Sequence, residues 1–174
     1  MSESFARFSQ RWYPASHPLL DIPASLRDWL LSSGSLTQQL TQFAHGQFHV
    51  QPFKQQFQRV LLHESQLLGI SHTANAWVRE VYLYGDQAQP WVKARSIIPV
   101  KTLNGKGRQL KYLGSRSLGS VLFGRHAPLC QRQIARLPAG WARRSLYIWQ
   151  QQPLIVQEVF LSDFCQALIE REHS

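Results

Sequence analysis

WVREVYLY at 77–84 and WVKARSIIPV at 91–100 are the two clearest strand sequences of the chain, and GDQAQP at 85–90 separates them. Both runs are rich in Trp, Val, Ile and Tyr, residues that favour a half-buried pleated strand. The segment between them contains the Gly, Asp and Pro that are typical of hairpin loops. We therefore expect an antiparallel β-hairpin here.

A second pair of strands is expected toward the carboxyl end of the chain. SLYIWQ at 145–150 and PLIVQEVFL at 153–161 flank a short turn around Gln151. Upstream of the first hairpin, Phe48 and Val50 alternate with His49, and residues 57–62 form another apolar run. Period-two alternation of this kind indicates further extended chain.

Short helices are expected before and between these hairpins. Helix signals occur at Leu26–Leu31 after Pro23, from an N-cap Ser35 to near Gly46, from Ser117 to Gly124, and after Ser162. Helices placed around successive hairpins predict an α+β fold on an antiparallel sheet. Because no linker or repeat interrupts the pattern, we expect a single domain over residues 1–174, with residues 1–18 as a loosely ordered lead-in.

The sequence lacks the usual signals for export, membrane insertion or metal binding. The amino terminus has no apolar core behind a basic start, and no eighteen apolar residues run together. Cys130 and Cys165 are isolated, so we expect free, buried thiols. These features predict a cytoplasmic protein.

Positive charge is concentrated in the middle of the chain. The formal net charge is +9, and no carboxylate lies between Asp86 and Glu158. That stretch carries Lys93, Arg95, Lys101, Lys106, Arg108, Lys111, Arg116, Arg125, Arg132, Arg136, Arg143 and Arg144. Such a field favours an anionic partner, and charge alone leaves both nucleic acid and a small anion open.

Two charged residues lie on apolar strand faces. Arg79 shares its face with Trp77, Val81 and Leu83, because side chains alternate along a strand. Glu158 shares its face with Leu154, Val156 and Phe160. An isolated buried charge is costly, so each side chain needs a partner. They could form a structural ion pair with each other, or they could line a cavity for a ligand that carries an acid and a hydroxyl.

Weaker signals accompany this pair. Arg95 shares a face with Trp91 and Ile97, and could either add a second cation to the same region or extend to water. The helix starts at Ser35 and Ser117 offer backbone N–H groups near Leu36 and Leu118 that could bind an anion, although most helix starts bind only water or their own cap.

Five segments in fixed order and spacing connect the chain to a known family. They are WVRE at 77–80, QPWVKARSIIPVKTL at 89–103, LGSRSLGSVLF at 113–123, GWARRS at 140–145 and QPLIVQEVFL at 152–161. Together they resemble the chorismate pyruvate-lyase family, and PASLRDWLLSSGSLTQQL at 23–40 extends the similarity. Ala94 departs from the glycine that the family commonly has there.

The resemblance implies a fold and an activity. It implies a monomeric α+β protein with a six-stranded antiparallel sheet, helical flaps over an internal site, and no metal or organic cofactor. It also implies removal of pyruvate from chorismate to give 4-hydroxybenzoate, the first step of ubiquinone biosynthesis, without nucleic acid or stable membrane insertion.

The resemblance also implies roles for individual residues. Arg79 matches an arginine that binds the ring carboxylate, and Leu118 matches a backbone N–H donor to the same carboxylate. Glu158 matches a glutamate that faces the ring hydroxyl, and Leu36 matches a residue that covers the ligand. We further expect Arg95 to hold the enolpyruvyl carboxylate of this dianionic substrate. Whether Glu158 transfers a proton or only orients the substrate stays open.

The main alternative is a non-catalytic, small-anion-binding regulatory domain of the same fold. Such effector domains usually follow a helix-turn-helix domain, and the roughly twenty residues before Asp21 leave no room for one. A basic nucleic-acid-binding module is the second alternative.

Overall fold

The hairpin expected at 77–100 is formed by β3 (Asn75–Tyr84) and β4 (Val92–Pro99) in the computed structural model, which describes residues 11–18 and 20–172. The two strands are antiparallel, in register from Ala76 opposite Pro99 to Leu83 opposite Val92. The Trp91 N–H donates to the Leu83 carbonyl at 2.8 Å and closes the loop. This prediction is confirmed.

One antiparallel sheet organises the molecule, in the order β1-β5-β6-β7-β4-β3-β2. The other strands are β1 (Tyr13–Pro14), β2 (His49–Arg59), β5 (Leu129–Leu137), β6 (Gly140–Trp149) and β7 (Gln152–Phe160). The sheet therefore has seven strands, and the expected count of six is wrong. The additional strand is β1, whose Tyr13 and Pro14 pair with Ile134 and Gln133. It falls within the expected lead-in, of which residues 1–10 lie outside the described residues.

The expected helices are present. They are α1 (Ala24–Leu31), α2 (Leu36–Phe43), α4 (Leu118–Gly124) and α5 (Ser162–Glu172). Ser35 and Ser117 act as N-caps, accepting from Gln38 N at 3.3 Å and Ser120 N at 3.1 Å. The sequence patterns missed α3 (Leu62–Leu68) and the 3-10 helices η1 (Val100–Leu103) and η2 (Gly105–Lys111).

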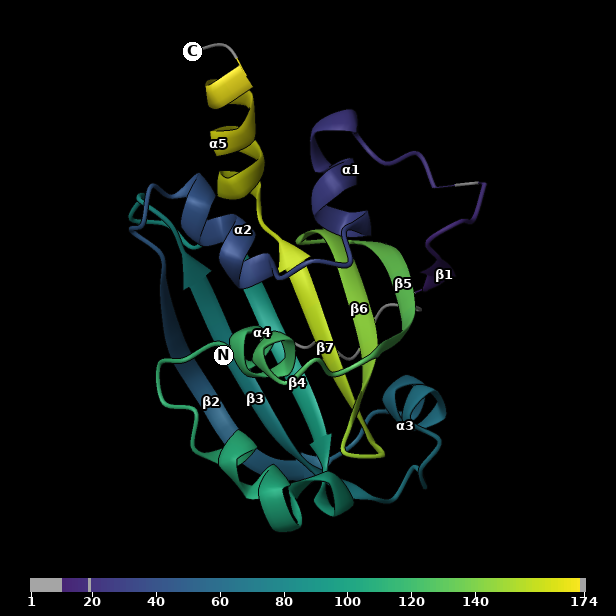
Figure 1. Ribbon diagram of the computed structural model, residues 1–174. Helices are drawn as coiled ribbons and strands as arrows, with labels where there is room; N and C mark the ends of the chain where they lie inside the picture. Colours follow the sequence, from purple (N-terminus) through teal and green to yellow (C-terminus); the bar gives the residue numbers. More distant parts are fainter. Residues whose placement is uncertain (1–10, 19, 173–174) are drawn as a thin grey trace.

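Most helices cover one face of the sheet. Helices α2 and α4 lie in front of it in Figure 1, and α1 and α5 lie at its upper end. One core cluster joins α1, α2 and α5 to strand residues such as Leu83 and Phe160, and a second joins η1, η2 and α4 to residues such as Ile98 and Val156. Helix α3 covers the opposite face, where Leu68 packs in a cluster with Val78 and Ile97. The first face thus has two apolar clusters with space for a site between them.

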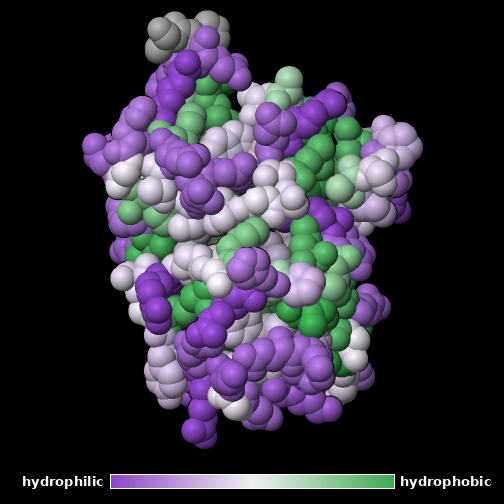
Figure 2. Space-filling view, in the orientation of Figure 1, coloured by the Kyte–Doolittle hydropathy of each residue, from purple (hydrophilic) through white to green (hydrophobic). Residues whose placement is uncertain are grey.

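The outer surface is mixed in character. Figure 2 shows a mainly hydrophilic end at the bottom of the view, where Figure 1 places η1 and η2. Cys165 is half-buried, but Cys130 is exposed, so the expectation of two buried thiols is wrong for Cys130. No helix within the described ranges is long and apolar enough to cross a membrane.

Candidate active site

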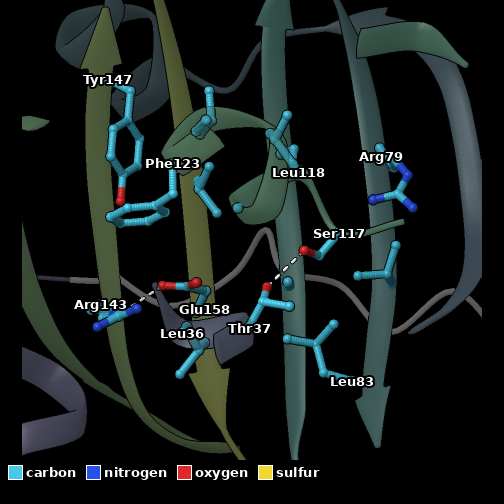
Figure 3. A pocket seen from close by; sticks show the side chains of 16 residues that line it. Leu36, Thr37, Arg79, Leu83, Ser117, Leu118, Phe123, Arg143, Tyr147 and Glu158 are labelled. Atoms are coloured by element: carbon cyan, nitrogen blue, oxygen red, sulfur yellow. Dashed lines mark hydrogen bonds and ion pairs between the residues drawn. The ribbon is translucent and has the colours of Figure 1, made fainter. Parts of the chain in front are cut away.

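A pocket lies between the sheet and the helices α2 and α4. Its floor comes from β3, β4, β6 and β7, and its cover from α2 and α4 (Figure 3). It is lined by Leu36, Thr37, Arg79, Val81, Leu83, Ala94, Ser96, Ser117, Leu118, Gly119, Leu122, Phe123, Arg143, Tyr147, Val156 and Glu158. Four of the five residues singled out from the sequence, namely Arg79, Glu158, Leu36 and Leu118, therefore meet here.

Arg79 lies on the pocket face of β3, as strand alternation predicts. Its side chain is 2% exposed, and its Nη2 donates to the carbonyls of Gly114 at 2.8 Å and Arg116 at 2.9 Å. Its Nε has no hydrogen-bond partner among the described residues. Burial lowers the pKa of Arg79 to about 10. A carboxylate entering the pocket would supply the missing partner of a buried, cationic donor.

Glu158 points into the pocket from β7, but its partner is not Arg79. Its Oε2 accepts from the Nε of Arg143 at 2.5 Å, and Arg143 is 1% exposed. The interpretation of Arg79 and Glu158 as a structural ion pair is therefore wrong. Strand pairing explains this difference, because Arg143 stands directly opposite Glu158 on β6. Arg79 is one strand further away, on the far side of β4.

Arg95 lies on the opposite face of the sheet, so its expected place in the pocket is wrong. Its Nε donates to Glu64 Oε1 at 2.8 Å, and its Nη1 donates to Glu80 Oε1 at 3.3 Å. Trp91 precedes the first residue of β4, so the alternation of side chains along the strand does not place Trp91 and Arg95 on the same face. Arg95 does share a face with Ile97, and Glu80 is its cross-strand neighbour.

A hydrogen bond joins the two helices that cover the pocket. Thr37 in α2 and Ser117 at the start of α4 share a hydrogen bond of 2.6 Å between their hydroxyl oxygens. Leu36 and Leu118, the first residues of the two helices, are 4% and 3% exposed. The two helices are therefore joined directly above the pocket.

Three polar side chains on β5 and β6 were not among the site residues expected from the sequence: Arg132, Arg143 and Tyr147. Arg143 belongs to the quoted segment GWARRS. Tyr147 lines the pocket, and its hydroxyl points toward the side where Glu158 and Arg143 lie (Figure 3). Burial raises the pKa of Tyr147, and the Glu158 carboxylate raises it further, while Arg132 and Arg143 oppose that increase.

The charges around the pocket do not cancel. Arg79, Arg132 and Arg143 contribute three guanidinium groups against the single carboxylate of Glu158, which leaves two positive charges in excess. Only the Arg143–Glu158 pair is neutralised internally. The site can thus bind a small dianion and present a carboxylate to a hydroxyl group of that ligand.

The described residues contain no group of three or more His, Cys, Asp or Glu side chains placed to hold a metal ion.

Comparison with known proteins gives sequence relatives over most of the chain. A family model described as "Chorismate lyase" matches residues 9–169. A probable chorismate pyruvate-lyase of Acinetobacter baumannii is 49% identical over 148 residues, covering 85% of this chain and 87% of the relative. Its counterpart from Pseudomonas putida is 42% identical over 171 residues, covering 91% and 92%.

Comparison with solved structures supports the fold. The effector domain of PhnF from Mycobacterium smegmatis superposes with a TM-score of 0.57, covering 76% of this chain and 91% of that domain. The two sequences are 14% identical, so this similarity concerns the fold alone.

Proposed function

Because the chain belongs to the chorismate lyase family, we propose that it removes pyruvate from chorismate and leaves 4-hydroxybenzoate. One observation carries the proposal beyond family membership. The pocket has a buried arginine with an unused donor on one wall and a carboxylate held by a second arginine on another. These two groups are chemically complementary to a ring that carries a carboxylate and a hydroxyl at opposite positions.

Arg79 is proposed to bind the ring carboxylate of chorismate. Its Nη2 is fixed by the Gly114 and Arg116 carbonyls, so the guanidinium is held in place before the substrate arrives. The backbone N–H of Leu118, at the start of the covering helix α4, is proposed as a second donor to the same carboxylate. Leu36 covers the ring from α2.

Glu158 is proposed to accept a hydrogen bond from the C4 hydroxyl of the ring. Arg143 occupies Glu158 Oε2, which leaves Oε1 for the substrate. Arg143 Nη1 also donates to the carbonyls of Trp29 at 2.6 Å and Ser32 at 3.3 Å. Arg143 therefore fixes the carboxylate relative to the loop between α1 and α2.

The reaction breaks the C3–oxygen bond of the enolpyruvyl ether and removes the hydrogen at C4. In a cyclic transition state, that hydrogen moves to the enolpyruvyl methylene carbon, the ether oxygen becomes the carbonyl of pyruvate, and the ring becomes aromatic. Aromatisation makes the reaction strongly favourable, so the main task of the protein is to hold one reactive conformer in a pocket with fixed charges. No metal ion is needed for this sequence of bond changes.

The wider setting is proposed on the same basis. Production of 4-hydroxybenzoate would place the protein at the first step of ubiquinone biosynthesis, acting as a cytoplasmic monomer. The family membership supports this setting.

One incubation tests the activity. Purified protein is mixed with chorismate in the presence of EDTA, and pyruvate and 4-hydroxybenzoate are quantified beside an Arg79→Ala variant, which lacks the proposed ligand of the ring carboxylate. We expect equimolar products from the wild-type protein and much less of both from the variant. Binding of chorismate without product would instead favour a regulatory role, and salt-sensitive binding of nucleic acid without turnover would favour the second alternative.

A further inference from the structure

Chorismate carries a second carboxylate, on its enolpyruvyl group, and the residues discussed so far leave it without a binding site. We propose that Tyr147, supported by Arg132, binds this carboxylate. The inference rests on the proposed function and replaces the expectation that Arg95 would do so. It is carried by three observations: the chemistry of the two flanks of the pocket, the strand register, and an unused buried donor.

The two flanks of the pocket differ in chemistry. Arg79 and Glu158 mark the positions of ring atoms C1 and C4, so the enolpyruvyl ether at C3 lies beside Glu158. One flank of the line between them is formed by Val81, Leu83, Leu36 and Thr37, and the Thr37 hydroxyl is already bonded to Ser117. The other flank includes Tyr147, whose hydroxyl points toward this space (Figure 3). A carboxylate would find no cationic donor among the described residues of the first flank, and leaving it unpaired there would be costly.

The register of the sheet brings Arg132 to the same flank. Arg79, Ser96, Val156, Ser145 and Arg132 occupy successive cross-strand positions from β3 to β5, all on the pocket face. Tyr147 is two residues beyond Ser145 on β6 and therefore shares that face. Arg132 and the Tyr147 hydroxyl lie close enough there for their side chains to interact directly.

The Arg132 guanidinium is held in place by hydrogen bonds that do not use all of its N–H donors. Its Nε donates to Ser145 Oγ at 2.7 Å, and its Nη1 donates to the carbonyls of Leu30 at 3.1 Å and Ser32 at 2.8 Å. Its Nη2 is buried and makes no hydrogen bond of good geometry among the described residues, and the nearest hydroxyl that interacts with the guanidinium is that of Tyr147. A buried donor of a charged group without a partner is unusual, and a bound carboxylate would explain it.

This arrangement would separate substrate from product. Arg79 and Glu158 contact groups that chorismate and 4-hydroxybenzoate have in common, whereas Tyr147 and Arg132 contact a group that only chorismate carries. Tyr147 would then act as a specificity residue. Its removal should weaken substrate binding and leave product binding nearly unchanged.

The test compares two stable ligands, 4-hydroxybenzoate and 3-(carboxymethoxy)-4-hydroxybenzoate, by calorimetry. The second ligand places a carboxylate on an ether at C3, so the measurement does not depend on turnover. Tyr147→Phe should weaken the carboxymethoxy ligand by about tenfold or more, the usual effect of losing a hydrogen bond to a charged group. The Kd of 4-hydroxybenzoate should change less than twofold. Tyr84→Phe is the matched control, because Tyr84 stacks on His49 at the edge of the sheet.

Arg132 is tested with two variants. Arg132→Gln removes the cation and should lose the preference for the carboxymethoxy ligand, whereas Arg132→Lys should retain part of it. Thermal unfolding and the Kd of 4-hydroxybenzoate report whether either variant disturbs the fold. Equal weakening of both ligands in Tyr147→Phe, or no weakening of either, would overturn the subsite. Failure of the wild-type protein to convert chorismate would instead overturn the proposed function, and the ligand comparison would still be readable.

Discussion

Arg143 makes the shortest polar contacts of the site and illustrates how a buried charge is tolerated. It has three acceptors, namely the Glu158 carboxylate and the carbonyls of Trp29 and Ser32. A buried pair of this kind gains little net stability over apolar residues, but removing one partner leaves the other charge uncompensated. Each residue of the pair is therefore stable in its buried position only while the other is present.

Replacement of Arg143 should be severe for stability. Arg143→Met is expected to lower the free energy of unfolding by about 3–5 kcal/mol, because Glu158 would remain buried without the cation that is hydrogen-bonded to it. The measurement is urea denaturation. In the double variant Arg143→Met/Glu158→Gln, the second change should recover part of the loss. A loss below about 0.5 kcal/mol in Arg143→Met would contradict a buried, dependent pair.

Glu158 and Arg79 should differ in their contribution to catalysis. If Glu158 only orients the hydroxyl, Glu158→Gln still offers an amide oxygen and should lose less kcat/KM than Arg79→Ala, which removes the cation that binds the ring carboxylate. A loss of about 10²-fold or more is reasonable for Arg79→Ala. Steady-state kinetics with chorismate decide this. A Glu158→Gln protein with unchanged substrate affinity and no turnover would show that Glu158 moves a proton.

Strand alternation identified Arg79 and Glu158 because each is a single charge in an otherwise apolar face. The same reasoning failed at β6, where Arg143 and Arg144 are adjacent, point to opposite faces and are both buried. Alternation of polar and apolar residues cannot identify the buried face of a strand when both faces carry charged residues. Strand β5 was missed for a related reason: LCQRQIARL has polar residues on both faces, and its register shifts between Leu129 and Gln131.

At the scale of elements, the hydrogen bond between Thr37 and Ser117 joins the two covering helices. Thr37→Val keeps the shape of the side chain and removes its hydroxyl. The loss of one hydrogen bond of about 1 kcal/mol should speed the release of 4-hydroxybenzoate by roughly fivefold. Stopped-flow measurement of a product burst tests this, with Thr41→Val as the control, because Thr41 bonds only within α2 to the Thr37 carbonyl. Unchanged release would show that opening does not depend on this contact.

On the other face of the sheet, a histidine of helix α3 makes the free energy of unfolding depend on pH. Its His63 is half-buried, and its Nδ1 lies 2.9 Å from Arg144 Nη1. Burial lowers the pKa of His63, Arg144 and Arg95 lower it further, and Glu64 opposes them. The unfolded chain therefore binds a proton more readily than the folded one. Stability that is complete above about pH 6.5 is lost as the pH falls toward the folded pKa.

This dependence can be isolated by substitution. His63→Gln should flatten the decline in the free energy of unfolding between pH 7.5 and pH 5.5, since glutamine does not titrate. Urea denaturation at three pH values measures the slope, and His72→Gln, which changes an exposed histidine, is the control. Equal slopes in wild type and His63→Gln would mean that other groups cause the decline.

At the scale of the whole molecule, charge is divided between the two ends. The exposed carboxylates Asp21, Asp28, Asp86, Glu170 and Glu172 belong to the end with α1, α5 and the β3–β4 loop. The opposite end, with η1 and η2, carries the exposed Lys101, Lys106 and Arg108, and no exposed carboxylate of the described residues belongs to these two elements (Figure 1). The remaining carboxylates near the sheet, Glu64, Glu80 and Glu158, are buried in ion pairs. A dianion such as the proposed substrate is therefore attracted toward the basic end of the molecule before it makes contact.

This attraction predicts a dependence on ionic strength. Added salt screens exposed charges beyond about 10 Å at 0.1 M, so kcat/KM for chorismate should fall between about 0.02 M and 0.3 M salt, whereas kcat should stay nearly constant because the bound substrate is shielded. The double variant Lys106→Glu/Arg108→Glu should lower kcat/KM at low salt and reduce its salt dependence, without changing kcat. If the variant and the wild type follow the same salt curve, the charges that attract the substrate are those of the pocket alone.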